Sequence, residues 1–209
     1  MKLYYTPMTC SLATNIACRE AGVAVDMIRV ELGSKRIAGG GDLTTVNAMG
    51  QVPTLVTDEG RILTENPAVL TYVADFAPDK GLAPPAGSFE RYELTRWLAF
   101  VGTEIHKKGL ALIYDPTTPD VVKSFARAAM AKPLAVAEAH LAGREFLLGT
   151  AFTVADAYFF WALTITPFAG VQLAAYPSLR TYQKRVYARP AVRAAVDQER
   201  GERERGFAA

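Results

Sequence analysis

The sequence has little cysteine, little histidine and almost no excess of charge of either sign. Among its 209 residues two are Cys and two are His, and 23 basic against 21 acidic side chains leave a formal net charge of +2. So little cysteine excludes a disulfide-stabilised secreted scaffold and favours a cytoplasmic protein. A nearly neutral chain offers no basic surface for neutralising phosphates, so we expect no nucleic-acid partner.

Long apolar segments are also scarce. The N-terminus lacks an apolar run of signal-peptide length. Residues 157–179 carry no charge, but Pro167, Gly170 and Pro177 interrupt them. We therefore expect a buried helix there and no membrane partner. Half of the residues are hydrophobic and 21% are charged, which is typical of a globular protein and excludes disorder.

A segment rich in proline and glycine divides the chain, and we take residues 81–88 as a linker because such a segment cannot continue a helix. Residues 1–80 alternate strand and helix patterns in the order of a thioredoxin-like domain. Residues 89–209 show only helical periodicity. The predicted fold is an α/β, thioredoxin-like N-terminal domain followed by an all-α C-terminal domain.

The patterns also predict the individual elements. In the first domain we expect strands at 2–6, 25–32, 52–57 and 61–64, and helices at 12–21 and 66–76, the second with Asn66 as N-cap. In the second domain we expect helices at 89–113, 120–141 with a kink or break at Pro133, 178–188 and 191–199, and a buried helix opened by a capping box at Thr153–Asp156. The mixed charges of residues 197–205 indicate a solvated end.

Cys10 lies where the first strand is expected to give way to the first helix. A helix start carries partial positive charge and unpaired N–H groups, which lower the pKa of a thiol. Cys10 is therefore a candidate nucleophile, or a donor that holds another thiolate. Cys18, inside the helix, is a packing residue. Since Ser11, Leu12 and Ala13 follow Cys10, a Cys-x-x-Cys dithiol cycle is excluded.

Two further motifs indicate a peptide-like ligand. Pro53 enters a predicted strand without an N–H to donate, so we expect a cis Val52–Pro53 bond that turns the Val52 backbone outward toward an extended peptide. Glu65 and Asn66 stand at a predicted helix start, which suits a ligand carboxylate beside an amino group. Together with Cys10, these motifs point to glutathione, a thiol tripeptide with an amino-acid head.

The ordered motifs resemble the cytosolic glutathione S-transferases, most closely the bacterial beta class. The resemblance runs over essentially the whole chain and is carried by Lys2–Pro7, Cys10–Leu12, Gly50–Pro53, Leu63–Glu65, Phe89–Tyr92, Trp97–Leu98, Glu104–Lys107 and Thr153–Tyr158. Two departures are Ala99, where the beta class often has Asn, and the turn Pro7-Met8-Thr9, which usually contains glycine.

The resemblance implies a role for each matching residue. Cys10 and His106 would be catalytic, with Cys10 facing the glutathione sulfur. Val52 and Pro53 would bind the cysteinyl backbone, Lys35 the glycyl carboxylate, and Glu65 with Asn66 the γ-glutamyl head. Thr103, Glu104 and His106 would complete the site, Glu104 reaching across a homodimer interface. Helical phase places Met8, Leu110 and Tyr114 at a second-substrate pocket, and Tyr5 is taken as structural.

The resemblance implies an enzyme that conjugates reduced glutathione to small hydrophobic electrophiles, a detoxification activity. Glutathione would be a co-substrate, with no other cofactor and no metal. Two alternatives stay open: a glutathione-dependent thiol–disulfide oxidoreductase that uses Cys10, and a non-catalytic ligand-binding dimer.

Overall fold

A computed structural model describes residues 1–207, which form two compact units. One unit is Met1–Leu82 together with the segment that begins at Arg189, and the other is Ala83–Ala188. The terminal helix therefore belongs to the first unit, whereas the sequence predicts residues 89–209 as one helical domain. No helix in the described part of the chain is long and apolar enough to cross a membrane.

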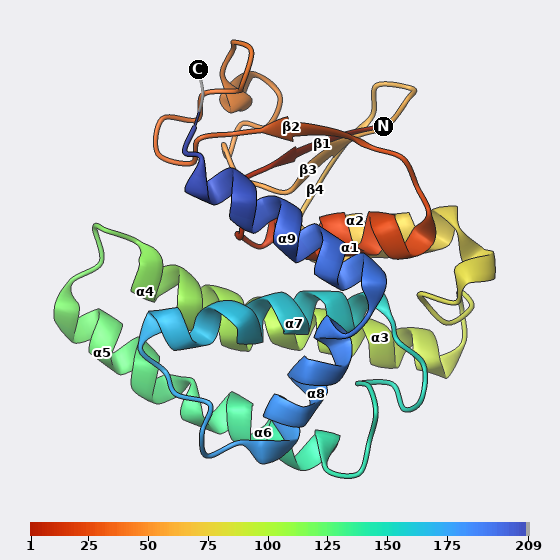
Figure 1. Ribbon diagram of the computed structural model, residues 1–209, viewed down its shortest axis with the longest axis vertical. Helices are drawn as coiled ribbons and strands as arrows, with labels where there is room; N and C mark the ends of the chain where they lie inside the picture. The colour runs from red at the N-terminus through yellow and green to blue at the C-terminus, as the bar shows by residue number, and fades with distance from the viewer. Residues whose placement is uncertain (208–209) are drawn as a thin grey trace. The chain divides into compact units, whose positions relative to one another are not determined.

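The first unit is built on a four-stranded mixed sheet in the order β2-β1-β3-β4 (Figure 1). The strands are β1 (Lys2–Tyr5), β2 (Asp26–Arg29), β3 (Thr54–Val56) and β4 (Ile62–Thr64). β1 pairs in parallel with β2 and antiparallel with β3, and β3 forms an antiparallel hairpin with β4. This arrangement confirms the thioredoxin-like fold predicted from the sequence.

Three α-helices accompany this sheet. They are α1 (Ser11–Ala21), α2 (Asn66–Phe76) and α9 (Pro190–Glu204), and two short 3₁₀ turns are η1 (Leu43–Thr45) and η2 (Pro78–Lys80). α1 packs against both α2 and α9, so it is buried along most of its length. It ends as predicted at Gly22, whose φ of 67° supplies the left-handed conformation that glycine adopts at low cost.

α9 joins the first unit through a buried carboxylate. Glu199 is fully buried and accepts hydrogen bonds from the Met8 N–H at 2.7 Å and from Asn15 Nδ2 at 2.9 Å. Val192 and Val196 are buried on the same helix face, seven and three residues before it. The prediction of a solvated end at 197–205 is therefore wrong for Glu199, because its charge faces α1 and the loop before it.

The second unit is helical, as predicted. Its elements are α3 (Phe89–Phe100), the π-helical segment η3 (Val101–Ala111), α4 (Leu112–Tyr114), α5 (Asp120–Ala129), α6 (Ala131–Leu141), α7 (Val154–Ile165), the 3₁₀ turn η4 (Thr166–Ala169) and α8 (Pro177–Tyr187). α3, η3 and α4 follow one another without interruption. The predicted break in 120–141 falls at Met130, so Pro133 lies in the first turn of α6, where its missing N–H removes no helical bond.

Asp156 anchors the start of α7. The carboxylate is fully buried, and the predicted capping box with Thr153 is present. Oδ2 accepts from the Thr153 N–H at 2.8 Å, while Oδ1 accepts from the Leu147 N–H and from the Tyr182 hydroxyl, each at 2.9 Å. Burial raises the Asp156 pKa to about 6, although these hydrogen bonds oppose the shift.

Replacing Asp156 by Ala should destabilise the protein by about 3–5 kcal/mol, since four buried donors, among them the Thr153 hydroxyl, lose their acceptor. The free energy of unfolding in urea measures this loss. Asp120→Ala, at the exposed start of α5, is the matched control and should cost less than about 1 kcal/mol. Equal losses for the two variants would contradict the anchoring role.

Replacing Glu199 by Gln should change how stability depends on pH. Burial raises the Glu199 pKa from 4.5 to about 7, so the folded protein holds this proton more tightly than the unfolded chain. As pH rises from about 4.5 to about 7, deprotonation of Glu199 should therefore lower the wild-type free energy of unfolding by on the order of 2–3 kcal/mol. Glu199→Gln keeps an acceptor and removes the titration.

The difference in unfolding free energy between wild type and variant, measured from pH 4.5 to pH 7.5, tests this expectation. Glu204→Gln, on the exposed last turn of α9, should leave the wild-type profile unchanged. A Glu199→Gln profile parallel to wild type would show that the Glu199 carboxyl titrates alike in the folded and unfolded states.

Candidate functional site

Strand register brings four chain segments to one end of the sheet. Tyr5 pairs with Arg29, Tyr4 with Thr54, and Thr54 with Thr64. The segments that follow β1, β2 and β4 therefore lie at the same end as the segment that precedes β3. These segments carry the predicted site residues Cys10, Lys35, Val52, Pro53, Glu65 and Asn66.

Cys10 stands directly before α1 and is partly exposed. Its thiol donates to the Val52 carbonyl at 3.1 Å. The Val52–Pro53 peptide bond is cis, as predicted. No hydrogen bond from the Val52 N–H to any of residues 1–207 is present, so this N–H and the adjacent carbonyl are disposed for an extended peptide beside the thiol.

Asn66 links the two helix starts instead of capping its own helix. The N-cap position of α2 is Glu65, and no side chain caps this helix, so the predicted Asn66 cap is wrong. Asn66 Nδ2 donates to the Cys10 carbonyl at 3.1 Å, and Asn66 Oδ1 accepts from the Thr14 hydroxyl at 3.3 Å. Because its amide is directed to α1, the first N–H groups of α2 are left for solvent or an anion.

Backbone strain is concentrated on predicted site residues. Met8, Lys35 and Glu65, with φ of 64°, 63° and 66°, are the non-glycine residues of positive φ within residues 1–207. Each such conformation costs about 1–3 kcal/mol and persists only where its surroundings hold it. Glu199 holds the Met8 N–H, and the backbone of Lys35 bonds to Glu31 and Leu43, each at 2.8 Å.

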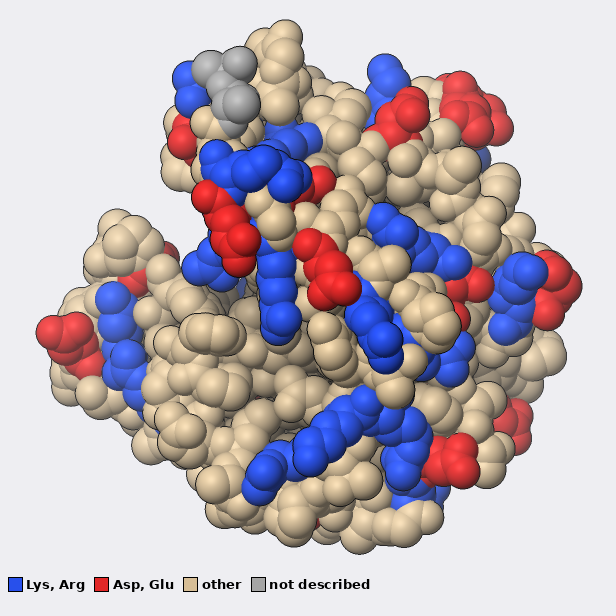
Figure 2. Space-filling model, viewed as in Figure 1, with Lys and Arg blue, Asp and Glu red and all other residues tan. Residues whose placement is uncertain are grey.

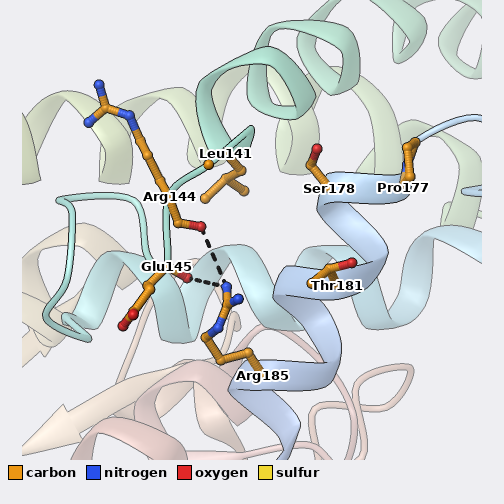
Figure 3. A pocket seen from close by; sticks show the side chains of 8 residues that line it. Leu141, Arg144, Glu145, Pro177, Ser178, Thr181 and Arg185 are labelled. Atoms are coloured by element: carbon orange, nitrogen blue, oxygen red, sulfur yellow. Dashed lines mark hydrogen bonds between the residues drawn. The ribbon is translucent and has the colours of Figure 1, made fainter.

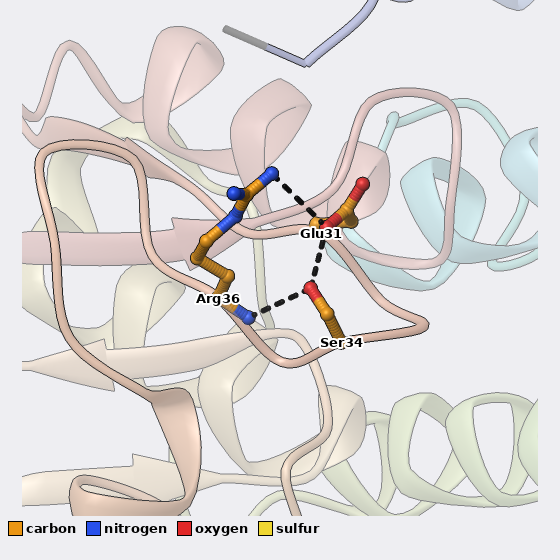
Figure 4. A network of polar contacts seen from close by, with 3 residues as sticks. All are labelled: Glu31, Ser34 and Arg36. Carbon is orange, nitrogen blue, oxygen red and sulfur yellow. Dashed lines mark hydrogen bonds and ion pairs between the residues drawn. The ribbon is translucent and has the colours of Figure 1, made fainter. Parts of the chain in front are cut away.

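The Lys35 loop has its own polar network (Figure 4). Glu31 accepts from the Ser34 hydroxyl and from Arg36 Nη2, the second at 3.4 Å. The aliphatic stem of Lys35 passes close to Gly50: a Cβ there would meet Lys35 Cδ and Cε at 3.2 Å. Lys35 thereby approaches the segment that leads into Val52.

Sequence reasoning missed Asn47 and Thr54, two buried residues that hold this segment. Asn47 Nδ2 donates to the Gln51 carbonyl at 3.0 Å and to Thr54 Oγ1 at 2.9 Å, and the Thr54 hydroxyl donates to the same carbonyl at 2.8 Å. The available signal was an Asn three residues before Gly50, a pairing typical of turns.

The remaining predicted glutathione-binding residues belong to the helical unit. Thr103, Glu104 and His106 share the π-helical segment η3. Glu104 accepts from the Thr103 hydroxyl at 3.2 Å and pairs with Lys108 at 3.3 Å. His106 Nδ1 lies 2.7 Å from the Tyr158 hydroxyl. Burial, with a smaller effect of Lys107, lowers the His106 pKa to about 4, so the ring is neutral at pH 7.

The residues predicted for a second-substrate pocket differ in exposure. Met8 and Leu110 are buried, with 8% and 1% of their surface exposed, whereas Tyr114 is 48% exposed. The Tyr114 hydroxyl donates to the Ile165 carbonyl at 2.9 Å. The role of these three residues toward a second substrate stays a prediction.

A cavity of about 380 Å³ opens in the helical unit (Figure 3) and contains none of the predicted site residues. Arg185 lies across it and donates to the carbonyls of Arg144 and Glu145, at 3.5 and 3.0 Å. Its guanidinium is therefore engaged by the protein. Figure 2 shows Lys and Arg in separate groups, many beside Asp or Glu, which agrees with the small net charge.

Two family models match the chain. The glutathione S-transferase N-terminal domain matches residues 7–75, and the glutathione S-transferase C-terminal domain matches residues 103–199. Glutathione S-transferase GstA of Escherichia coli O157:H7 is 37% identical over 199 residues, which are 95% of this chain and 98% of that protein.

Solved structures agree with these matches. The beta class glutathione S-transferase of Sphingomonas chungbukensis has a TM-score of 0.92 at 42% identity, covering 95% of this chain and 98% of that one. A sphingomonad glutathione S-transferase complexed with glutathione has a TM-score of 0.91 at 43% identity, with the same coverage. The thioredoxin-like sheet, the cis Val52–Pro53 bond beside Cys10 and these full-length similarities lead to one conclusion: the chain belongs to the glutathione S-transferase family.

Proposed function

We propose that this protein conjugates reduced glutathione to small, largely apolar electrophiles. The observation that carries the proposal is the contact of the helix-start thiol of Cys10 with the cis Val52–Pro53 turn, whose Val52 N–H bonds to none of residues 1–207. A thiol tripeptide fits both at once, since its backbone can bond to Val52 while its sulfur meets Cys10. The similar sphingomonad enzyme, whose structure holds glutathione, supports this assignment.

The two ends of glutathione find complementary groups at the same end of the sheet. The Lys35 ammonium suits the glycyl carboxylate, and the uncapped start of α2 suits the γ-glutamyl α-carboxylate. Glu65, exposed and strained at that helix start, is placed for the adjacent ammonium, with Asn66 beside it. Strain at a helix start that no side chain caps is typical of ligand sites.

The chemistry requires a thiolate. The glutathione thiol gives its proton to solvent, the thiolate attacks the electrophilic carbon to form a C–S bond, and the leaving group departs with its electron pair. The partial positive charge at the start of α1 stabilises the anionic sulfur. Hydrogen bonding from the Cys10 thiol can do the same.

The helical unit would supply the rest of the site. In this proposal Thr103, Glu104 and His106 complete the glutathione site, and Glu104 serves the partner subunit of a homodimer. Met8, Leu110 and Tyr114 would line the pocket for the electrophile. We place the enzyme in the cytoplasm, in keeping with two cysteines that form no disulfide.

A second candidate activity rests on the partial exposure of Cys10 at a helix start. There Cys10 could attack a disulfide, form a mixed disulfide with one sulfur and release the other as a thiol, and glutathione would then regenerate Cys10. The two activities separate on Cys10→Ala. If conjugation is the main activity, this variant should keep measurable conjugation and lose disulfide reduction.

Wild type and Cys10→Ala should therefore be assayed side by side for conjugation to an aryl halide and for reduction of a mixed disulfide, with Cys18→Ala as the buried control. If wild type reduces the mixed disulfide faster than it conjugates the aryl halide, and Cys10→Ala loses the reduction, the oxidoreductase is the principal activity. A third candidate, a non-catalytic ligand-binding dimer, predicts that neither reaction occurs. Absence of glutathione binding in calorimetry would contradict both enzymatic candidates.

Replacing Gly50 by Ala should weaken glutathione binding. The new Cβ would lie 3.2 Å from Lys35 Cδ and Cε and from Thr44 Cγ2, and we expect the flexible Lys35 side chain to move, which displaces its ammonium. Loss of one charge-assisted contact corresponds to a KM for glutathione raised about tenfold, or ~1.4 kcal/mol. The kcat at saturating glutathione should change little.

Gly60→Ala is the matched control. Gly60 also has a positive φ, of 78°, but a Cβ there meets nothing within 4 Å. Both variants should lose about 1–2 kcal/mol of stability from the left-handed backbone, and only Gly50→Ala should raise the KM. An unchanged KM in Gly50→Ala, or an equal rise in both variants, would contradict the proposed role of Lys35.

A further inference from the structure

His106 lies in the middle of a rare kind of helix. The segment η3 (Val101–Ala111) is π-helical, whereas its neighbours α3 and α4 are α-helical. π-helical turns are uncommon and are frequent at functional sites. The side chain of His106 contacts another helix of the same unit, α7.

Two aromatic residues of α7 hold the imidazole. The Tyr158 hydroxyl lies 2.7 Å from His106 Nδ1. Trp161 meets the imidazole edge-to-face, with ring centroids 4.7 Å apart and planes at 73°, and Tyr158 stacks on Trp161 at 5.7 Å. The imidazole is therefore fixed in orientation by a hydrogen bond to Tyr158 and by edge-to-face contacts with both rings, the Tyr158 ring centroid lying 6.0 Å away.

The helix that carries these two residues is itself fixed. Tyr158 and Trp161 are each only 2% exposed. They follow Asp156, whose buried carboxylate caps α7 and accepts from Leu147 and Tyr182. The Tyr158 hydroxyl is thus a stationary partner for His106, held by the packing of α7.

The protonation state of His106 gives this hydrogen bond a chemical consequence. The ring is neutral at pH 7, so one nitrogen carries a proton and the other is an acceptor. A phenol hydroxyl is a stronger donor than acceptor, and an imidazole nitrogen with a lone pair is a strong acceptor. The favoured arrangement has the Tyr158 O–H donating to Nδ1, which leaves the ring proton on Nε2.

We propose that Tyr158 is the positioning residue of His106: its hydroxyl holds Nδ1 and selects the tautomer whose Nε2–H is the group that the ring offers to a ligand. An N–H donor suits an anionic atom such as a thiolate sulfur. Use of this donor toward glutathione rests on the proposed function. Selection of the tautomer by Tyr158 does not rest on the proposed function, because Tyr158 and His106 lie in the same unit.

The test is a long-range ¹H–¹⁵N correlation spectrum of ¹⁵N-labelled protein at pH 7. The chain has only two histidines, so both imidazoles can be assigned with one His→Gln variant. His140 is an internal reference: its Nε2 lies 2.8 Å from the Leu147 carbonyl, which can only accept, so His140 is an Nε2–H tautomer. Wild-type His106 should show the same pattern, with a protonated Nε2 and an unprotonated Nδ1.

Tyr158→Phe removes only the hydroxyl. His106 should then lose its single-tautomer pattern, while the His140 signals stay unchanged. Tyr182→Phe is the matched control: it removes another buried hydroxyl that bonds to α7, at Asp156 Oδ1, and should leave the His106 tautomer as in wild type.

A wild-type His106 protonated on Nδ1, or a His106 pattern unaltered by Tyr158→Phe, would overturn the proposal. The wild-type spectrum decides by itself should Tyr158→Phe fail to fold. Kinetics distinguish this inference from the proposed function. If His106 serves the glutathione sulfur, Tyr158→Phe should also lower kcat/KM for conjugation, whereas a changed tautomer with unchanged kcat/KM supports the inference and refutes the catalytic role of His106.

Discussion

The pairing of β1 with β2 on one side and with β3 on the other is the constraint on which the candidate site depends. It sets the loop after β1, the loop after β2 and the turn before β3 at one end of the sheet, and the β3–β4 hairpin adds the start of α2. Four short stretches, far apart in sequence, are thereby brought to one place. No single stretch offers more than one or two of the required groups.

Conformational strain in these stretches is balanced by contacts that lie outside them. Met8 keeps a positive φ because the buried carboxylate of Glu199, on α9, accepts its N–H. The start of α9 is held in turn by a salt bridge between Arg189 Nε and Glu20 Oε1, 2.7 Å apart. The terminal helix therefore supports the loop that carries Cys10, which is a reason for it to belong to the sheet-containing unit.

Much of this could be predicted from the sequence, because the signals were local. Cys10 at a strand–helix junction, the cis bond before Pro53 and the capping box of Asp156 each depend on a few neighbouring residues and on backbone chemistry. The prediction of Asn66 as a helix cap is wrong for the same reason. An Asn before a proline at a helix start is a good local cap, but the Cys10 carbonyl, 56 residues away in sequence, competes for its amide.

The residues that escaped prediction are polar side chains buried by tertiary contacts. Glu199 stands among solvent-facing charges, and only the packing of α9 on α1 shows that this one carboxylate is enclosed. Asn47 and Thr54 look like ordinary turn and strand residues until the fold turns both toward the Gln51 carbonyl. Such residues form hydrogen bonds with buried backbone N–H and C=O groups. These groups need a protein partner only once folding has removed them from water.

The two units hold their polar groups by different physical means. In the sheet-containing unit, the side chains of Asn66 and Glu199 bond to backbone groups of Cys10 and Met8 and fix their positions. In the helical unit, the neutral imidazole of His106 is held by a hydrogen bond to Tyr158 and by a ring contact with Trp161, both on α7. A neutral donor costs far less to bury than a charged one, so His106 can remain in a packed helix core and still offer an N–H. A protonated His106 would need a counter-charge there, and Lys107 beside it makes that state less favourable still.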